Sequence, residues 1–458
     1  MRQFEGFTLV ELLVVLAIMG IVFSLAGTML VFSMRSHDAI EEEFEIQSSM
    51  RLASQIVVNY IRESSAMFML NSSQFDNDNL KNEWDYFGLS PDRKQVIQYK
   101  WNSVSSTHDP IILADSYPGI VYSLAFHKSD NDSLLGGFSI QAVTEAGHIK
   151  VGIDNEINAV NTVVVDNTGN SGDPAVALAY RTHDIPDPSK PRISVTLVLD
   201  KSGSMAWNLD GNTISGGAGN TNSRLSIMRA RTLDLISELE DIGNVHVAVV
   251  RFDTNANKSG NYHTLYNLDT AEETVSDLVR SMTVAEGRTN IGDAMRRAYY
   301  IHNTFKSSNT GNLLHYNIQL MDGNPTYWTN SSTGYVYADG QVTGSFNVRG
   351  TGQETEINMN NSMNYVSSIG ENLYKLGTVE IKTFVIGFSA NSGNINRLSS
   401  IADYVTSESN QNIIGQYYEA SSSEALQQVY RDIKRKIELD AWHIFGPNNL
   451  KGGVGHEE

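Results

Sequence analysis

A long apolar segment dominates the start of this 458-residue chain. From Leu12 to Met34 the sequence is mainly apolar and carries no charge, and it exceeds the roughly 20 residues with which a helix spans a bilayer. Apolar residues then recur at helical spacing on one face: Ile46, Met50, Ala53, Val57 and Ile61. We therefore expect one helix from Phe7 to about Phe68, apolar all round at first and amphipathic afterwards.

After Ser72 the pattern changes to short apolar runs between clusters of Asn, Asp, Gly and Ser. Such runs indicate strands, and the expected ones are Val96–Trp101, Gly119–Phe126, Gly137–Thr144, Ile149–Ile153 and Val160–Val165. Three of the nine prolines of the chain then fall between Asp184 and Pro191. Because each proline fixes φ and removes a donor, this segment predicts a semi-rigid extended linker and a domain boundary.

Beyond the linker, apolar strand patterns alternate with amphipathic helix patterns. The expected strands are Ile193–Leu199, Val245–Phe252, Tyr316–Met321 and Glu380–Phe388; the expected helices are Arg224–Leu239, Glu272–Met282, Ile291–Phe305 and Ser423–Leu439. This alternation predicts a parallel sheet with helices on both faces.

Two long polar segments interrupt the alternation. Ala206–Asn222 is rich in Gly and Asn, and Asn324–Met363 contains an alternating stretch around Asp339-Gly340 that predicts a hairpin. They are either tolerated surface insertions or segments that shape a binding face.

Composition narrows the function classes. A formal net charge of −19 argues against nucleic acid, which requires a basic face, and against charge-driven docking on anionic lipid. A hydrophobic content of 41% is ample for real cores, and the length suggests two to three domains. Cysteine is absent, so an exported protein of this kind relies on core packing and on any metal it binds.

Candidate chemistry lies at the end of the first strand beyond the linker. Asp200, Ser202 and Ser204 follow the apolar run Ile193–Leu199 at alternating positions, where ligands of open α/β sheets bind. One carboxylate and two hydroxyls are hard oxygen donors, suited to Mg²⁺ or Mn²⁺ rather than to zinc. On its own, D-x-S-x-S is a short motif in a Ser-rich chain.

Two later segments extend this motif. Thr289 stands at the mouth of an expected helix, and Asp322-Gly323 ends another expected strand. Together, Asp200, Ser202, Ser204, Thr289 and Asp322 resemble the metal-ion-dependent adhesion site of von Willebrand factor A domains, over about 191–439. The resemblance implies that the hydroxyls bind one divalent cation directly and the carboxylates largely through water. It leaves one coordination position for an acidic residue of a partner.

The N-terminus carries a second motif. Gly6-Phe7-Thr-Leu-Val-Glu11 places a small residue before the apolar run and a glutamate inside it. A signal peptide would place a small-residue cleavage site after the run, and an ordinary anchor leaves unexplained a carboxylate that costs about 2.5–3.5 kcal/mol at a helix centre. The pattern resembles the class III leader of type IV pilins. It implies that a prepilin peptidase cleaves after Gly6, that Phe7 becomes N-methylated, and that Glu11 neutralises the terminal amine of a neighbouring subunit.

These patterns lead to a domain plan. It comprises a leader (1–6), the apolar half of the helix (7–34), a pilin module (35–183), a linker (184–191), an A domain (192–440) and a tail (441–458). The fold class expected from the resemblance is an α+β pilin module, with a long helix and a small antiparallel sheet, followed by an α/β, Rossmann-like, doubly wound domain.

Three function classes remain. An adhesin would be a minor pilin whose A domain binds host matrix or plasma glycoproteins, with the membrane (through 7–34), prepilin peptidase and other pilins as earlier partners. A structural or assembly-initiating subunit would use the metal for stability alone. An enzyme is disfavoured, because the sequence contains no H-E-x-x-H pattern, no Cys and no Gly-rich phosphate loop. By resemblance to modular minor pilins of streptococcal type IV pili, we favour an adhesin at the pilus tip, and the lack of cysteine favours a Gram-positive source.

Overall fold

The structure is a computed structural model of the chain, and two units make it up. It describes residues 9–128, 135–159, 162, 164–167, 174–184, 190–256, 260–339, 347–406 and 414–447. Unit 1 contains residues 1–183 and 447–449, and unit 2 contains residues 184–446 and 450–458. The expected linker lies mostly outside the described residues, because 185–189 are not among them.

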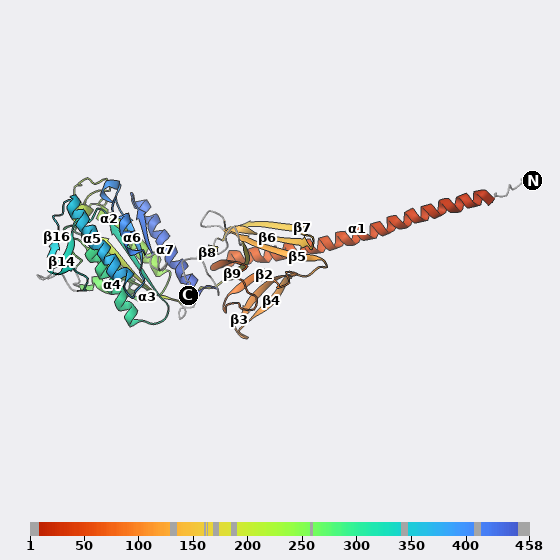
Figure 1. Ribbon diagram of the computed structural model, residues 1–458, viewed down its shortest axis with the longest axis horizontal. Helices are drawn as coiled ribbons and strands as arrows, with labels where there is room; N and C mark the ends of the chain where they lie inside the picture. The colour runs from red at the N-terminus through yellow and green to blue at the C-terminus, as the bar shows by residue number, and fades with distance from the viewer. Residues whose placement is uncertain are drawn as a thin grey trace, which may run out of the picture. The chain divides into compact units, whose positions relative to one another are not determined.

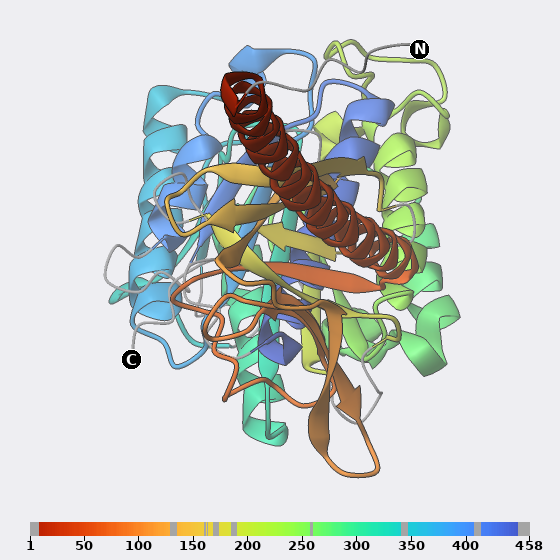
Figure 2. The same cartoon turned by 90° about the vertical axis from the view of Figure 1, so that its right-hand side faces the viewer.

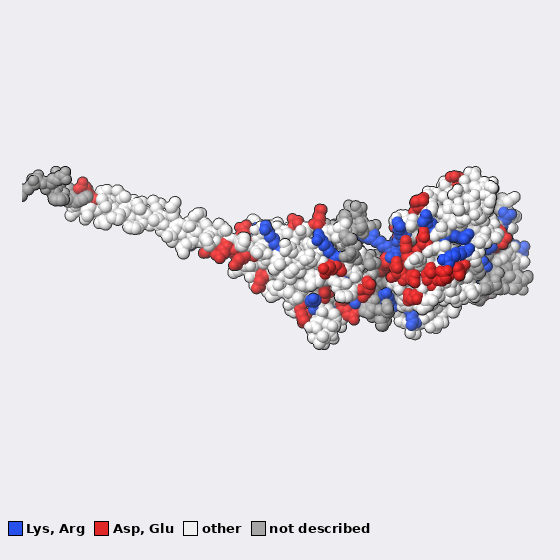
Figure 3. Space-filling view, turned by 180° about the vertical axis from the view of Figure 1, so that it is seen from behind, with Lys and Arg blue, Asp and Glu red and all other residues white. Residues whose placement is uncertain are grey.

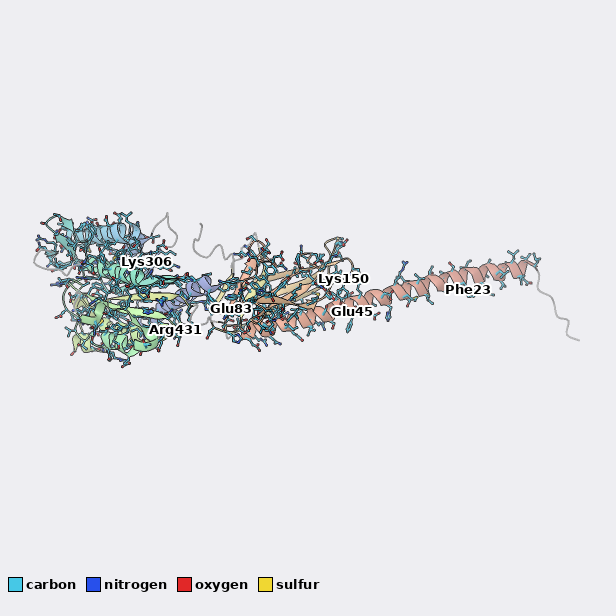
Figure 4. All side chains as sticks on the ribbon, turned by 90° about the horizontal axis from the view of Figure 1, so that it is seen from below. Phe23, Glu45, Glu83, Lys150, Lys306 and Arg431 are labelled. Atoms are coloured by element: carbon cyan, nitrogen blue, oxygen red, sulfur yellow. The ribbon has the colours of Figure 1, made fainter. Side chains whose placement is uncertain are left out.

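Unit 1 begins with α1 (Leu9–Glu63), the one helix of the described chain that is long and apolar enough to cross a membrane. Its first half is exposed, and Phe23 and its neighbours radiate outward from the helix axis in Figure 4. The helix ends at Glu63 rather than near Phe68, so the expected end was wrong. The cause is the apolar run Ala66–Asn71, which forms a fully buried strand, β1.

A nine-stranded sheet completes unit 1 (Figure 1). Its other strands are β2 (Asp85–Leu89), β3 (Val96–Asn102), β4 (Thr107–Ala114), β5 (Ile120–His127), β6 (Leu135–Thr144), β7 (Ile149–Ile157), β8 (Val164–Asn167) and β9 (Ala175–Arg181). The main path runs β4-β3-β2-β9-β5-β6-β7, all antiparallel, and β1 pairs with β9 and β8. The expected stripe of α1, from Ile46 to Ile61, is fully buried in one core with the apolar face of this sheet.

Unit 2 is built on a six-stranded sheet in the order β12-β11-β10-β13-β17-β18. Its strands are β10 (Arg192–Asp200), β11 (Val245–Phe252), β12 (Tyr266–Asn267), β13 (Leu313–Met321), β17 (Lys382–Gly387) and β18 (Gly415–Glu419). All neighbouring pairs are parallel except β11–β12. Alternate residues of β10 enter two cores, with Leu197 and Leu199 on one face and Val198 on the other.

Helices cover both faces of this sheet, as seen in Figure 2. On one face lie α2 (Arg224–Glu240), α3 (Leu268–Arg280) and α7 (Ser423–Phe445), and on the other lie α4 (Ile291–Ser308), α5 (Glu356–Ile369) and α6 (Ser399–Val405). The expected fold class is therefore confirmed for both units.

Some expected element bounds in unit 2 were wrong. Helix α7 continues to Phe445, because Ala441 and Trp442 are buried beyond the expected end at Leu439. The expected polar insertion 324–363 contains the start of α5 and a small sheet of β14 (Trp328–Ser331), β15 (Gly334–Tyr335) and β16 (Asn347–Arg349). The described hairpin of β14 and β15 turns between Ser331 and Gly334. The hairpin expected around Asp339-Gly340 lies largely outside the described residues, because 340–346 are not among them.

Candidate metal centre

The sequence-predicted metal residues of unit 2 lie where its central strands end. Asp200 is the last residue of β10, and Asp322 directly follows β13, the parallel neighbour of β10. Both carboxylates are fully buried. Because parallel strands end at the same edge of a sheet, the fold brings together two acids that are far apart in sequence.

Hydrogen bonds connect four of the five residues. The Ser202 amide donates to Asp200 Oδ1 at 2.7 Å, which fixes the loop directly after the strand. The hydroxyls of Ser202 and Ser204 lie 3.1 Å apart, and Ser204 Oγ donates to Asp322 Oδ1 at 2.9 Å. The two hydroxyls and two carboxylates thus form one continuous group of oxygen atoms.

Thr289 reaches the same edge through its loop. The amide of Gly203, between the two serines, donates to Gly287 O at 3.3 Å. The Thr289 carbonyl accepts from the amides of Thr326 and Tyr327, at 3.0 and 3.1 Å, a few residues beyond Asp322. The Thr289 loop is therefore held against both the Ser202–Ser204 turn and the segment after β13, with Thr289 itself 6% exposed.

An arginine that sequence reasoning missed completes the group. Arg224 Nη1 donates to Asp322 Oδ2 at 2.8 Å, and both side chains are fully buried. Its Nη2 donates to Leu209 O and to Ser389 Oγ, at 3.2 and 3.1 Å. Arg224 lies on the buried face of α2 with Met228, so an arginine on the apolar stripe of a helix was the available signal.

The electrostatics leave an unbalanced negative charge. Burial, and then the carboxylate of Asp322, raise the pKa of Asp200 well above its ordinary value. Burial also raises the pKa of Asp322, although the Arg224 guanidinium opposes that shift. Two buried carboxylates therefore face one buried arginine, and a cation beside Asp200 would relieve the excess.

The donor set fits a hard divalent cation. Asp200 Oδ2 is buried and has no hydrogen-bond partner among the described residues, and an unsatisfied buried carboxylate oxygen is costly unless an ion binds there. No group of three or more His, Asp or Glu that could hold a metal occurs in the described chain. A metal at this edge would therefore be held by hydroxyl and carboxylate oxygens, which suit Mg²⁺ or Mn²⁺.

The N-terminal motif lies at the start of α1. Gly6 and Phe7 fall outside the described residues, whereas Glu11 stands exposed in the first turn of the helix. Figure 3 shows a long stretch of the helix beyond that turn as a surface without charged side chains, which ends where acidic side chains of the helix appear ahead of the sheet. Glu11 is thus an isolated acid at one end of an apolar rod.

Comparison with known proteins identifies both parts. Residues 1–27 match the prokaryotic N-terminal methylation motif, and residues 195–314 match the von Willebrand factor type A domain. The PilB minor pilin from Streptococcus sanguinis has 26% identity and a TM-score of 0.74, over 89% of this chain and 100% of PilB. A point mutant of PilB gives the same identity and TM-score over 88% of this chain and 100% of that one.

A weaker likeness extends to the pilus adhesin SpaC from Lactobacillus rhamnosus GG, at 13% identity and a TM-score of 0.38, over 79% of this chain and 43% of SpaC. No curated protein matches the chain. The leader motif and the two folds define a type IV pilin with a von Willebrand factor type A domain. Within that class, the match to PilB along nearly the whole chain makes this protein a modular minor pilin.

Proposed function

We propose that this minor pilin is an adhesin whose A domain binds host matrix or plasma glycoproteins through an acidic residue of the partner. The observation that carries the proposal is the unpartnered, buried Oδ2 of Asp200 beside the hydroxyls of Ser202 and Ser204. A buried group of hydroxyl and carboxylate oxygens is suited to binding a metal, and a metal with an open position is suited to binding a carboxylate.

The residues of the proposed site have different roles. Ser202, Ser204 and Thr289 are the proposed direct ligands of Mg²⁺ or Mn²⁺. Asp322 already accepts from Ser204 and Arg224, so it orients Ser204 and supports the ion through water, as does Asp200. When bound, the ion supplies a Lewis acid that accepts the partner's carboxylate. We further propose that the protein is not an enzyme, since pilins and A domains are structural and adhesive modules.

A structural or assembly-initiating role is the alternative, and the buried acid pair favours it. A cation that offsets Asp200 and Asp322 would stabilise the A domain even if no partner bound. The two functions differ in one observable, which is whether loss of the metal removes adhesion or only stability.

The display of the module follows from the leader. Prepilin processing and the apolar helix place the chain first in the membrane and then in the pilus. We propose that the A domain occupies the tip, because a second module of this size would not fit inside a filament body. A Gram-positive source is favoured by the absence of cysteine and by the likeness to a streptococcal pilin.

A binding screen tests the proposal. The full chain in detergent is measured against a panel of matrix and plasma glycoproteins, with Mg²⁺ and with EDTA. Asp200→Ala, or Ser202→Ala with Ser204→Ala, should abolish metal binding and reduce adhesion to background while the A domain stays folded. Asp210→Ala, an exposed acid in the neighbouring loop, is the matched control. Full adhesion by Asp200→Ala in EDTA would leave the metal a purely structural role.

A further inference from the structure

One tryptophan stands beside the candidate metal centre with its side chain exposed. The chain has five tryptophans, and all of them lie in the described residues. Trp84 and Trp442 are buried, and Trp101 and Trp328 are half-buried, whereas Trp207 is 37% exposed. An aromatic side chain is a large apolar surface, so a partner that covers Trp207 gains binding free energy.

The backbone of Trp207 is fixed to the candidate metal centre on both sides. Its amide donates to the Ser204 carbonyl at 2.9 Å, and its own carbonyl accepts from the Arg224 amide at 2.9 Å. Ser204 is a proposed metal ligand, and Arg224 forms the buried ion pair with Asp322. Because both bonds use the backbone alone, the indole is presented from a fixed position next to the proposed ligands.

A second exposed apolar side chain lies at the other end of the same turn. Val284 is 56% exposed and belongs to the loop before α4. Two residues later, the Glu286 amide donates to the Lys201 carbonyl at 2.9 Å. The Val284 loop is therefore bonded to the start of the Ser202–Ser204 turn, as Trp207 is bonded to its end.

The short separation between Ser204 and Trp207 limits where a partner's apolar residue can lie. The two ends of a four-residue turn have Cα atoms within about 7 Å of each other, and an extended chain covers that distance in about two residues. A partner whose carboxylate binds the metal therefore brings its next one or two residues to Trp207. Val284 offers no side-chain hydrogen bond to a sugar hydroxyl, so the two positions together favour an apolar side chain of a protein over a glycan.

We propose that Trp207 and Val284 are apolar contacts for the partner, and that they select a protein segment with a large apolar side chain within two residues of its acidic residue. The inference rests on the proposed function, because the carboxylate on the metal brings the segment to Trp207. The metal accepts any accessible carboxylate, whereas Trp207 discriminates among the segments that carry one. Tryptophan is among the residues that contribute most to binding at protein interfaces.

Two labelled peptides test the inference. One carries a glutamate between leucine and phenylalanine, and the other carries the same glutamate between glycines. Fluorescence anisotropy measures their binding to the full chain in phosphatidylcholine nanodiscs with Mg²⁺, and EDTA gives the metal-independent background. The wild type should bind the apolar peptide about tenfold more tightly than the glycine peptide, the low end for covering one large apolar side chain. Trp207→Ala should bind the two peptides equally, with the Mg²⁺ affinity and melting temperature of the wild type.

Leu376→Ala is the matched control. Leu376 is 77% exposed but lies near the far end of α4, where the Lys306 side chain hydrogen-bonds to the Thr378 carbonyl. This variant should keep the tenfold preference. Trp207→Phe, which retains an aromatic ring, should keep part of the preference and covers the case in which the alanine variant does not fold.

Equal affinities of the two peptides for the wild type, or an unchanged preference in Trp207→Ala, would overturn the inference and leave the metal-bridged carboxylate in place. N-acetylneuraminic acid serves as a competitor that carries its carboxylate on a sugar. If it binds more tightly than the apolar peptide and loses that affinity in Trp207→Ala, Trp207 contacts a glycan and the inference is overturned. If neither peptide binds in a Mg²⁺-dependent manner, the proposed function fails, and the inference fails with it.

Discussion

Arg224 gives the candidate metal centre a fixed positive charge. It holds Asp322 by a buried ion pair and also donates to the Leu209 carbonyl, which anchors the polar segment after Ser204. Removing one partner of a buried ion pair leaves an uncompensated charge in a medium of low polarity. Asp322 without Arg224 would lie close to Asp200 with no cation to balance either.

We predict that Arg224→Gln lowers the free energy of unfolding of unit 2 by about 3–5 kcal/mol in EDTA. Saturating Mg²⁺ should restore part of the loss, because the ion supplies the missing positive charge. Urea denaturation with and without Mg²⁺ measures both effects. Arg231→Gln, on the same helix but in a partly exposed pair with Asp234, should change stability by less than about 1 kcal/mol. Equal losses in the two variants would contradict the role of Arg224.

Two histidines form a buried polar cluster on the α4 side of the sheet. His302 hydrogen-bonds through Nδ1 to Ser194 Oγ and through Nε2 to Thr196 Oγ1, at 2.8 and 2.9 Å, and His315 Nδ1 lies 2.7 Å from Ser194 Oγ. Burial lowers the pKa of His302 well below its ordinary value and lowers the pKa of His315 to about 4. Both rings are therefore neutral in the folded protein near neutral pH.

Acidification should consequently destabilise unit 2. In the unfolded chain both histidines bind a proton near pH 6.5, whereas in the folded chain they stay neutral to a lower pH. The stability that the neutral histidines contribute is therefore complete above about pH 6.5 and falls as the pH decreases. Each histidine contributes a slope of about 1.4 kcal/mol per pH unit until its folded pKa is reached. We predict that His315→Gln reduces the slope of unfolding free energy against pH by about 1.4 kcal/mol per pH unit between pH 6 and 4.5. Urea denaturation at fixed ionic strength measures this slope. An unchanged slope would mean that His315 titrates normally in the folded state.

At the scale of elements, the sequence predicts the helices and strands with a strong apolar periodicity and misses those without one. Strand β11 has the expected bounds, because its apolar run is regular. Helices α2 and α4 begin at the expected residues, because each has a regular apolar face and a Ser or Asn cap. Strand β18 (Gly415–Glu419) is short and only partly buried, so its pattern is that of a loop. Strand β1 was expected to be the end of α1, because a continuous run of apolar residues has neither a helix period nor a strand period.

The candidate metal centre was predictable to a different degree. Asp200, Ser202, Ser204, Thr289 and Asp322 follow strands or precede a helix, so the topology alone brings them to one edge. Arg224 reaches the same edge from the buried stripe of α2. Its position depends on how that helix packs, and a single sequence does not contain that information.

The contact between α4 and α5 gives a test at this scale. A Cβ on Gly292, in the first turn of α4, would stand 2.4 Å from the Tyr365 ring. We predict that Gly292→Ala destabilises unit 2 by about 1–3 kcal/mol through overpacking and weakens Mn²⁺ binding, because α4 carries the Thr289 loop at its start. Thermal unfolding and Mn²⁺ titration measure the two effects. Gly219→Ala, which meets nothing within 4 Å, is the control and should change neither.

At the scale of the whole molecule, processing decides whether the chain enters a filament. We predict that Gly6→Ala, or a bulkier residue there, blocks leader removal, because the peptidase no longer accepts the residue before the cleavage site. Mass spectrometry of the wild type should show a mature chain that begins at methylated Phe7. A mature chain that begins elsewhere would contradict this cleavage site.

Assembly provides a separate prediction. Glu11→Ala should leave membrane insertion intact, since it removes a charge from an apolar segment, but it should reduce incorporation into pili because the neighbour's terminal amine loses its partner. Immunoblots of sheared pili against membrane fractions measure this ratio. Glu43→Ala, at an exposed position in the second half of α1, should assemble normally. Wild-type incorporation of Glu11→Ala would leave the glutamate without its proposed role.

The position of β10 has a mechanical consequence. Strand β10 begins at Arg192, near the start of unit 2, and runs to Asp200; it is paired with β11 and β13 over nearly its whole length. A pull between a partner held at the metal centre and the filament would therefore travel along β10 and act parallel to its axis. In that direction the backbone hydrogen bonds on both sides are sheared together, whereas a pull across the sheet would open them one at a time. The strand that ends at Asp200 and leads into Ser202 and Ser204 is thus also oriented to transmit tension from a partner anchored there.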